Sequence, residues 1–358
     1  MVSRFDNMAE MDFSHCVEGG LLVCAGGFED RALTFVKRLR RSKTSFERVL
    51  LLRYESQRED NRANFDSLLS QVSCLTRSKP SVVSVNADNP IKSCADIGNK
   101  VKEISGELTT ATAYIDVSAM THLWALSAIH ECLIQRLQTQ IVYTEARWYF
   151  PTKQEARRLL RAWSEQEYET ASRYLQSKAL RAVHIPPEFS GNLRPGKQAC
   201  LMLFAGYEPN RVEGLVDTYA PGALVVLYGR SPRPELGWRA RLSRDLHKEL
   251  FSRWRLREIE TSTLLVDDIL AKLEEEFDVV REHYDVAVAP QCSKMQALAS
   301  YLFWRRHPEV QLLFTTPVRF NPARYSRGAG KTYVYKIGTL GGYLATPCDG
   351  SPESTVDI

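Results

Sequence analysis

The sequence lacks several features that would assign it to a class at once. It contains no run of about 18 uncharged apolar residues, so we expect no membrane-spanning helix. Its eight cysteines form no CxxC pair, which favours a reduced, intracellular protein without a zinc site. The opening stretch MVSRFDNMAEMDF carries acids where a signal peptide needs an apolar segment. We therefore expect a cytoplasmic protein with no membrane contact and no bound metal.

Common catalytic motifs are also missing. There is no HExxH, no GxSxG and no Cys/His spacing typical of a thiol nucleophile. A full GxGxxG loop is absent as well, so the sequence indicates no nicotinamide or other cofactor. Asp116 and Glu145 both follow expected strands and could act together as acid and base, but no catalytic residue is assigned.

What the sequence does contain suits two domains of ordinary size. The chain has 358 residues, 44% of them hydrophobic and 25% charged, with a net charge of +4. Apolar runs typical of buried strands alternate with amphipathic stretches typical of helices, which predicts mainly parallel sheets covered on both faces. The strands are expected at 20–25, 48–54, 81–85, 113–118, 140–144, 199–206, 223–229, 285–289 and 310–315. Helices are expected at 29–41, 59–73, 97–107, 120–137, 235–254, 263–277 and 293–306.

The second half of the chain repeats the plan of the first. Gly26 and Arg31 align with Gly206 and Arg211, each 180 positions later. YIDVSAMTHLWAL at 114–126 aligns with VAVAPQCSKMQAL at 286–298, and only the shared Gly and Arg recur at the opening turn. We therefore predict an α/β fold of two tandem Rossmann-like domains related by internal duplication. The expected divisions are 1–152 for the first domain, 153–196 for a helical segment and Pro/Gly linker, 197–345 for the second domain, and 346–358 for a flexible tail.

The stretch GGFEDR at 26–31 follows the first strand and GYEPNR at 206–211 follows its counterpart. A glycine at this place lets the backbone approach a ligand, and the start of the next helix favours anions. Gly26 and Gly27 suit that role, and Asp30 could hold a ribose hydroxyl or orient Arg31. An ordinary turn with a capped helix start explains each copy as well.

The stretch IDVSAMTH at 115–122 places polar groups at a strand end and a helix start. Its counterpart in the second half offers Ser293 and Lys294, a hydroxyl and a cation that suit a phosphate. The alternative is an N-cap with a solvated lysine. His122 could be a general base, or it could cap or pack against its own helix.

A third cluster, PVRFNPARYSRGAGKTYVYK at 317–336, combines arginines, glycines and a hydroxyl. We interpret it as a surface loop that clamps an anion, although it lacks the spacing of a Walker A loop. The stretch 237–258 interleaves tryptophans with arginines and could bind a nucleic-acid backbone. It could equally be an amphipathic helix with solvated arginines.

The strand, the D-x-S pattern and the helix that opens with Thr121 and His122 resemble the ligand loop of CARF domains. Two such units in one chain resemble SAVED domains, which pair two CARF-like folds. The resemblance implies a cytoplasmic, prokaryotic sensor of a nucleotide in antiviral defence, acting in a complex with a protein partner or effector. Two alternatives remain, namely an enzyme acting on nucleotides or nucleosides through Asp116 or Glu145, and a nucleic-acid-binding adaptor that uses 237–258.

The expected ligand is thus a nucleotide or another phosphorylated small molecule. The expected ligand-binding residues are Gly26, Gly27, Asp30, Arg31, Asp116, Ser118, Thr121, His122, Gly206, Arg211, Arg230, Ser293, Lys294, Arg319, Arg324, Ser326, Arg327 and Lys331.

Overall fold

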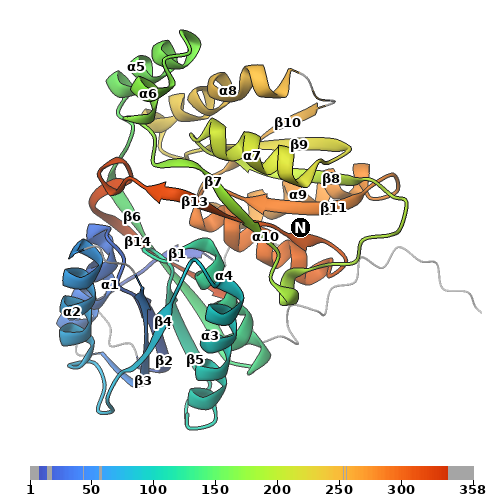
Figure 1. Cartoon of the computed structure of the whole chain (residues 1–358). Helices are drawn as coiled ribbons and strands as arrows, with labels where there is room; N and C mark the ends of the chain where they lie inside the picture. The colour runs from blue at the N-terminus through green and yellow to red at the C-terminus, as the bar shows by residue number, and fades with distance from the viewer. Residues whose placement is uncertain are drawn as a thin grey trace, which may run out of the picture.

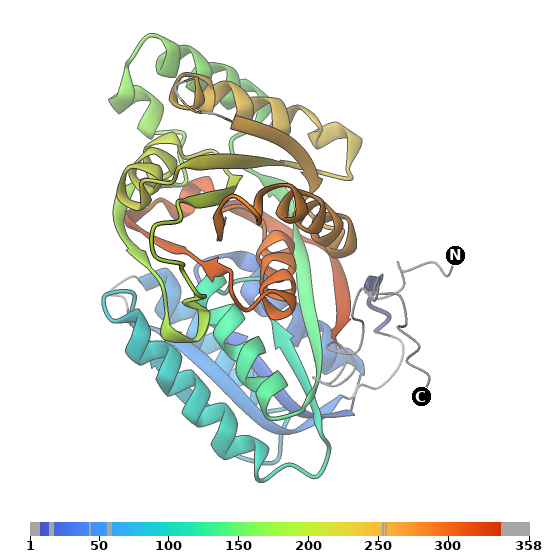
Figure 2. The same ribbon diagram turned by 90° about the vertical axis from the view of Figure 1, so that its right-hand side faces the viewer.

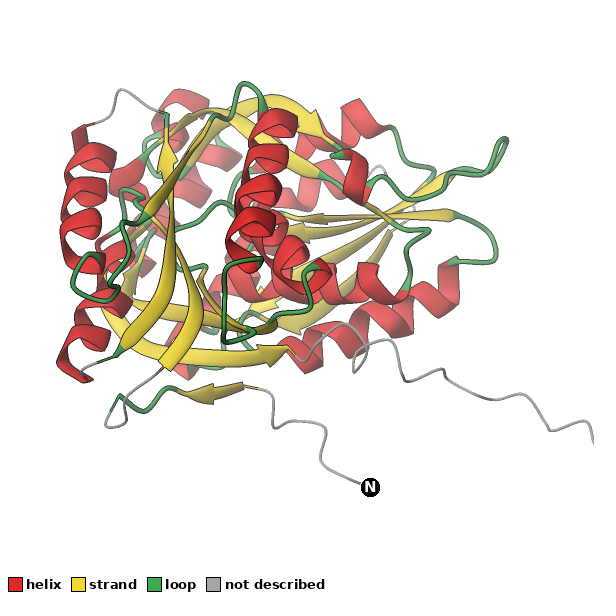
Figure 3. Cartoon of the chain, turned by 90° about the horizontal axis from the view of Figure 1, so that it is seen from below, coloured by secondary structure: helices red, strands yellow, loops and turns green. Residues whose placement is uncertain are grey.

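The computed structural model describes residues 8–13, 18–42, 44–55, 59–252, 254 and 256–337. Two large sheets, each with helices on both faces, lie one above the other in Figure 1. Figure 3, seen from below, shows the helices in red on either side of the yellow strands. The predicted α/β class with mainly parallel strands is confirmed.

The first sheet has seven strands in the order β1-β14-β6-β5-β2-β3-β4. Strands β4, β3, β2, β5 and β6 are parallel, whereas β14 and β1 are antiparallel additions at one edge. The bounds are β1 (Met8–Glu10), β2 (Glu18–Ala25), β3 (Ser45–Tyr54), β4 (Ser81–Val85), β5 (Thr112–Asp116), β6 (Gln138–Tyr149) and β14 (Ser326–Ile337).

The second sheet has five strands, all parallel, in the order β10-β9-β8-β11-β12. A separate antiparallel pair joins β7 to β13. The bounds are β7 (Ser177–His184), β8 (Ala199–Ala205), β9 (Ala223–Arg230), β10 (Leu256–Ser262), β11 (Asp285–Pro290), β12 (Gln311–Leu312) and β13 (Phe314–Phe320).

The helices cover the sheets in pairs. Helices α1 and α2 lie on the outer face of the first sheet, and α3 and α4 lie on its other face, where α4 contacts α10 of the second half. Their bounds are α1 (Thr34–Leu39), α2 (Glu59–Val72), α3 (Pro90–Ser105), α4 (His122–Ile134), α5 (Lys153–Ser164), α6 (Tyr168–Ser172), α7 (Pro209–Tyr219), α8 (Trp238–Phe251), α9 (Val266–Val280) and α10 (Lys294–Arg306).

One continuous apolar core joins the two halves. It contains side chains from β2 and β5 with α3 and α4, and from β8 and β11 with α9 and α10. The strand centres consist of apolar runs such as LLVCA and LMLFA, because both faces of a parallel sheet are covered by helices. The halves are therefore packed against each other rather than strung on a linker.

The two parallel sheets share one strand order. The first, second, third, fourth and fifth strands of each half are arranged 3-2-1-4-5, with β2 and β8 at the centre. Helices α4 and α10 follow the fourth strands and begin at aligned residues, His122 and Lys294. Descent of the halves from one duplicated unit, and the domain divisions drawn from the sequence, stay predictions.

The last described strand belongs to the first sheet, although it follows the second half in the chain. Strand β14 pairs antiparallel with β6 from Ser326 opposite Tyr149 to Ile337 opposite Thr139. Figure 2 shows this red strand beside the green strand β6. The segment 317–336, which we expected to be a surface loop, is thus two strands joined by a short 3₁₀ turn at Pro322–Arg324, and that interpretation is wrong. The expected tail at 346–358 lies outside the described residues.

Other differences from the expected elements have simple causes. The amphipathic stretch 235–254 is α8, but the expected basic helix ends early, because Leu256–Ser262 is a strand, β10, with charged side chains at the sheet edge. The expected linker contains α5, α6 and strand β7. These edge strands alternate polar and apolar residues weakly, so their pattern does not separate them from loops.

Candidate functional site

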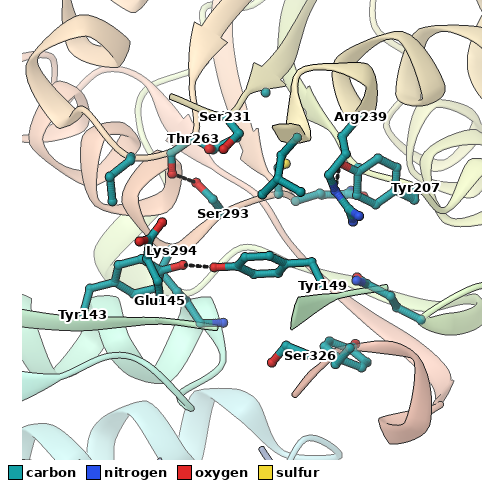
Figure 4. Close-up of a pocket in the computed structure, with 18 of the residues that line it drawn as sticks. Tyr143, Glu145, Tyr149, Tyr207, Ser231, Arg239, Thr263, Ser293, Lys294 and Ser326 are labelled. Carbon is teal, nitrogen blue, oxygen red and sulfur yellow. Dashed lines mark hydrogen bonds between the residues drawn. The ribbon is translucent and has the colours of Figure 1, made fainter. Parts of the chain in front are cut away.

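A cavity of about 180 Å³ lies where the carboxyl edges of the two parallel sheets meet. This is the place at which open α/β sheets bind ligands. The first half contributes the turn after β2 and the inward face of β6, and the second half contributes the turns after β8, β9, β10 and β11. Figure 4 shows this cavity with side chains from both halves pointing into it.

The turn after β2 supplies a buried ion pair to the cavity wall. Arg31 donates from Nε to Glu29 Oε2 at 3.0 Å and from Nη2 to Glu29 Oε1 at 3.2 Å. The same guanidinium donates to the Thr144 carbonyl at 3.1 Å. Glu29 and Arg31 are 8% and 7% exposed, so their charges must satisfy each other. Arg31 lines the cavity as half of an ion pair, and its role in ligand binding stays a prediction.

The turn after β8 repeats this pair. Arg211 Nη2 lies 2.9 Å from Glu208 Oε2, and Ser177 donates to the other oxygen of Glu208 at 2.7 Å. Our interpretation that only the Gly and the Arg recur is therefore wrong, since a Glu–Arg ion pair recurs. Glu208 lies three positions before its arginine, whereas Glu29 lies two positions before its own, so the alignment does not match the two glutamates. Their shared role as ion-pair partners is seen only in the structure. Gly206 lines the cavity and Arg211 lies behind it.

The remaining acid of GGFEDR has a structural task. Asp30 Oδ2 accepts a hydrogen bond from the Gly328 backbone at 2.9 Å. Ser326 donates from its hydroxyl to Glu29. Both acids of the first turn thus hold the beginning of β14, which has no counterpart in the second half. Ser326 also lines the cavity.

Lys294 enters the cavity from the first turn of α10, and Figure 4 shows it among residues of β6. Its neighbour Ser293 caps the helix, accepting from Gln296 N at 3.1 Å and donating to the Thr263 carbonyl at 2.8 Å. Within the described part of the chain, no carboxylate lies within ion-pairing distance of the Lys294 ammonium. Both residues line the cavity, and their expected role in ligand binding stays a prediction.

The surroundings of Lys294 disfavour its charge. Burial, the largest cause, lowers its pKa to about 8. The carboxylate of Glu29 opposes this shift, whereas the guanidinium groups of Arg31 and Arg211 add to it. Lys294 is therefore a cation close to two guanidinium groups and without an ion-paired carboxylate, so an anionic ligand would stabilise its charged form.

His122, the counterpart of Lys294 in the first half, is used differently. Its Nδ1 lies 2.7 Å from the Pro290 carbonyl, so it links the start of α4 to the end of β11. Burial lowers the pKa of His122 well below its ordinary value, and the charge of Lys294 adds to this. The imidazole is thus neutral and donates a hydrogen bond from Nδ1 to the Pro290 carbonyl, which connects the two halves of the chain. His122 does not line the cavity.

Asp116 and Ser118 form a buried network at the end of β5. Asp116 Oδ1 accepts from the backbone and the hydroxyl of Ser118, and the Ser118 hydroxyl accepts from Thr144 N at 2.8 Å. Burial raises the pKa of Asp116 to about 6, against the hydrogen bonds from Ser118. Neither residue lines the cavity, and nor does Thr121, the N-cap residue of α4. Their ligand-binding role stays a prediction.

The glycines of the first turn are required by packing. A Cβ on Gly26 would lie 2.7 Å from Phe65 Cα, and one on Gly27 would lie 2.8 Å from the Ala119 carbonyl oxygen. Those contacts explain both glycines without a ligand.

The remaining predicted cations lie away from the cavity. Arg324 is paired with Glu155 at 2.5 Å, and Lys331 with Glu10 at 2.7 Å. Arg230 lies 3.8 Å from Glu260, Arg327 lies over the Phe150 ring, and Arg319 is exposed on β13. The structure does not bring these five side chains together as one anion clamp.

Glu145 is the candidate acid or base that does line the cavity. Burial raises its pKa, while the charge of Arg233 and a hydrogen bond from the Tyr333 hydroxyl at 3.3 Å oppose that shift. Asp116 is absent from the lining, so the two acids do not converge on this cavity. An acid–base role for either residue stays a prediction.

Two of the three arginines of α8, Arg239 and Arg244, have partners inside the protein, whereas Arg241 is exposed. Arg239 donates to the carbonyls of Phe150 and Pro151 at 2.7 and 2.8 Å, which ties α8 to the end of β6. Arg244 is paired with Glu258 at 3.1 Å, and Arg257, beyond the helix, with Glu276 at 2.6 Å. These pairings remove much of the charge that a nucleic-acid backbone would meet on 237–258.

Sequence reasoning missed most of the aromatic lining. The cavity is also lined by Tyr143, Tyr149, Tyr207 and Tyr325, together with Gln291. Tyr207 follows Gly206 directly, and Gln291 precedes Ser293 in the aligned stretch, so both adjoined motifs already noted. Tyr143, Tyr149 and Tyr325 belong to β6 and to the turn before β14, and their convergence depends on a pairing that joins distant segments.

Neither a metal site nor a membrane span is found among the residues described. No three His, Cys, Asp or Glu side chains there are grouped to hold a metal ion. No described helix is both long enough and apolar enough to cross a bilayer.

Comparison with known proteins yields similarities of fold at low identity. No protein-family model matches the chain, and no curated protein sequence matches it significantly. Among solved structures, a type III CRISPR defence DNA nuclease activated by cyclic oligoadenylate aligns with 87% of this chain and 68% of its own, at 10% identity and a TM-score of 0.45. A UDP-GlcNAc 2-epimerase from Neisseria meningitidis aligns with 76% of this chain and 77% of its own, at 11% identity and a TM-score of 0.26. Similarities at this level do not identify a shared function, and the CARF-like resemblance stays a prediction.

Proposed function

We propose that the cavity binds a nucleotide or another small phosphorylated molecule, and that the chain is a sensing component of a prokaryotic defence system acting with a partner effector. The observation that carries the binding proposal is Lys294, a cation without a carboxylate partner that projects into a cavity between two parallel sheets. The defence setting is a separate part of the proposal and rests on the resemblance of IDVSAMTH to the CARF ligand loop.

The physical argument concerns charge balance. Glu29 and Glu208 are already paired with Arg31 and Arg211, and Glu145, whose pKa is raised mainly by burial, forms no ion pair with Lys294 in the described residues, so the Lys294 ammonium has no carboxylate partner. A phosphate beside Lys294 would supply the missing negative charge in a partly desolvated place, where charge-assisted hydrogen bonds are strongest. Because the cavity is lined by both halves, a bound ligand would also stabilise their packing and could pass a signal to a partner.

The first experiment is mass spectrometry of small molecules released from the purified protein, followed by titration with the compound found or with ribose 5-phosphate. Lys294→Met should weaken binding at least tenfold. Lys248→Met, an exposed lysine on α8, is the matched control and should leave binding unchanged. Equal affinity of both variants and the wild type for every phosphorylated probe would refute the proposal.

The pH dependence offers a second readout. Lys294 must be protonated to bind an anion, and its pKa is about 8. Affinity should therefore fall as the pH rises from 7 to 9, whereas a loss of affinity below about pH 6 reflects protonation of the phosphate itself. The ligand's contacts raise the pKa of Lys294 in the complex, so the affinity falls from the pKa of the free protein, about 8, up to the pKa in the complex.

An enzyme that acts on the bound molecule is the second candidate, and it is favoured by Glu145. This side chain lines the same cavity and its pKa is raised mainly by burial, as expected for a general acid. Glu145→Gln should then abolish turnover of a bound nucleotide while binding persists. A ligand recovered unchanged after prolonged incubation with the wild type supports the sensor instead.

A further inference from the structure

The cavity has an aromatic wall opposite the charged groups described above. Tyr149 comes from β6, Tyr207 from the turn after β8, and Arg239 from α8. The Arg239 guanidinium carbon lies 4.7 Å from the centre of the Tyr207 ring and 5.9 Å from that of Tyr149. Figure 4 shows the Tyr149 ring crossing the middle of the cavity, with Arg239 and Tyr207 close together beside it.

This wall is fixed before any ligand arrives. Arg239 donates to Tyr207 Oη at 3.1 Å and to the carbonyls of Phe150 and Pro151. The hydroxyl of Tyr149 accepts from Ala146 N at 3.0 Å and lies 3.4 Å from that of Tyr143. Flat side chains held in place at little entropic cost are the surface on which a planar ring stacks.

A buried hydrogen-bond donor without a partner belongs to the same lining. Gln291 is 7% exposed and lines the cavity, and its Oε1 accepts from Arg211 Nε at 3.4 Å. Its Nε2 has no hydrogen-bond partner in the structure. An unpaired buried amide group is costly in a folded protein and calls for a partner. Ring nitrogens and carbonyl oxygens of a nucleobase are acceptors of the required kind.

The size of the cavity limits the occupant. Its volume of about 180 Å³ is below the range of about 300–1,000 Å³ typical of pockets for drug-sized ligands. The space is therefore too small for a ring of several nucleotides, and a single nucleotide is the largest unit consistent with its volume.

We propose that the occupant is a single nucleotide whose base stacks on the wall of Tyr149, Arg239 and Tyr207, accepts a hydrogen bond from Gln291 Nε2, and places its phosphate beside Lys294. This inference rests on the proposed function for the phosphate end and adds a specific subsite for the base. A sugar phosphate without a base fills only the charged end of the cavity.

The test compares the four common ribonucleoside 5′-monophosphates with ribose 5-phosphate and adenosine by isothermal titration of the full chain. At least one monophosphate should bind the wild type tenfold or more tightly than ribose 5-phosphate. Tyr149→Leu should bring the two affinities within about threefold, while leaving that for ribose 5-phosphate unchanged. Tyr149→Phe keeps the ring and should retain the preference, and circular dichroism checks that both variants fold.

The two proposals fail in different ways. If ribose 5-phosphate binds as tightly as every monophosphate, with the binding sensitive to Lys294→Met, the base subsite is refuted and the proposed function stands. If adenosine binds as tightly as its monophosphate and Lys294→Met has no effect, the phosphate proposal fails whereas the aromatic subsite stands. If no probe binds the folded wild type, or if Tyr149→Leu leaves the preference intact, the base subsite is overturned.

Discussion

Replacing Lys294 with methionine should make the unliganded protein more stable. Lys294 is half-buried as a cation with no ion-paired carboxylate, and its pKa is lowered from 10.5 to about 8. That lowering corresponds to a penalty of about 3 kcal/mol on the charged form in the folded state. Methionine is similar in length and carries no charge, so Lys294→Met should raise the free energy of unfolding by up to about 3 kcal/mol at pH 7.

The sign of the pH dependence follows from the same numbers. Below pH 8 the lysine is protonated in both states, and the whole penalty is present. Between pH 8 and 10.5 the folded state releases its proton first, so the wild type regains stability as the pH rises. The advantage of the variant should therefore be largest below pH 8 and shrink toward pH 10.

The measurement is urea unfolding at pH 7, 8, 9 and 10, with Lys248→Met as the exposed control. The control should change stability by less than about 0.5 kcal/mol at every pH. A Lys294→Met variant that is less stable than the wild type at pH 7 would refute the reasoning, because it would show that the lysine contributes favourable contacts. An advantage that does not vary between pH 7 and 10 would contradict the assigned pKa.

Three further predictions concern residues around the cavity. Glu29→Gln leaves the buried Arg31 without its partner, so it should lower the free energy of unfolding, measured with denaturant, by about 3–5 kcal/mol. Glu107→Gln, which breaks an exposed ion pair, should lower it by no more than about 1 kcal/mol. Equal losses of stability in the two variants would contradict the importance of burial. The pKa of Asp116 is raised from 3.8 to about 6, so its negative charge opposes folding above pH 6. Asp116→Asn should therefore be more stable than the wild type by up to about 3 kcal/mol at pH 7 but not at pH 4. A difference in stability that stays constant between pH 4 and 7 would argue against the raised pKa. Arg239→Lys loses the paired hydrogen bonds to the carbonyls of Phe150 and Pro151, so it should lower the free energy of unfolding by about 2 kcal/mol or more and speed proteolysis near residues 150–153. Arg241→Lys, on the exposed face of the same helix, should change neither. Identical proteolysis of both variants would show that these hydrogen bonds do not hold α8 to the end of β6.

The sequence predicts the central architecture well because burial dominates it. The centres of strands such as β2, β8 and β11 are apolar runs, and the glycine turns that follow β2 and β8 mark the carboxyl edge of each sheet. The alignment of His122 with Lys294 also correctly places both at the first turn of a helix. Local periodicity therefore locates the elements that surround the cavity.

What the sequence does not reveal is which segments meet. Ser326 and Lys294 line one cavity, but Arg324 and Lys331, close to Ser326 in the chain, point to partners elsewhere. Arg324 lies in the 3₁₀ turn before β14, and Lys331 lies on β14 itself, whose side chains alternate between the two faces of the sheet. Strand β14 has no strong apolar pattern of its own, and its register is fixed by pairing with β6. Nor could composition show that Asp116 bonds to Ser118 and not to a ligand, because both arrangements use the same residue types.

The place of β14 in the first sheet also sets an order of events during synthesis. One edge of β6 has no strand to pair with until residues 326–337 have been made, 177 positions after Tyr149, the end of β6. At typical translation rates that delay is on the order of 10–35 s. The first half of the chain is thus synthesised first, but its sheet is completed last. Until then the 12-residue strand β6 has an unpaired edge that can form hydrogen bonds with strands of other chains. We therefore expect folding of the first half to respond to chaperones and to translation speed.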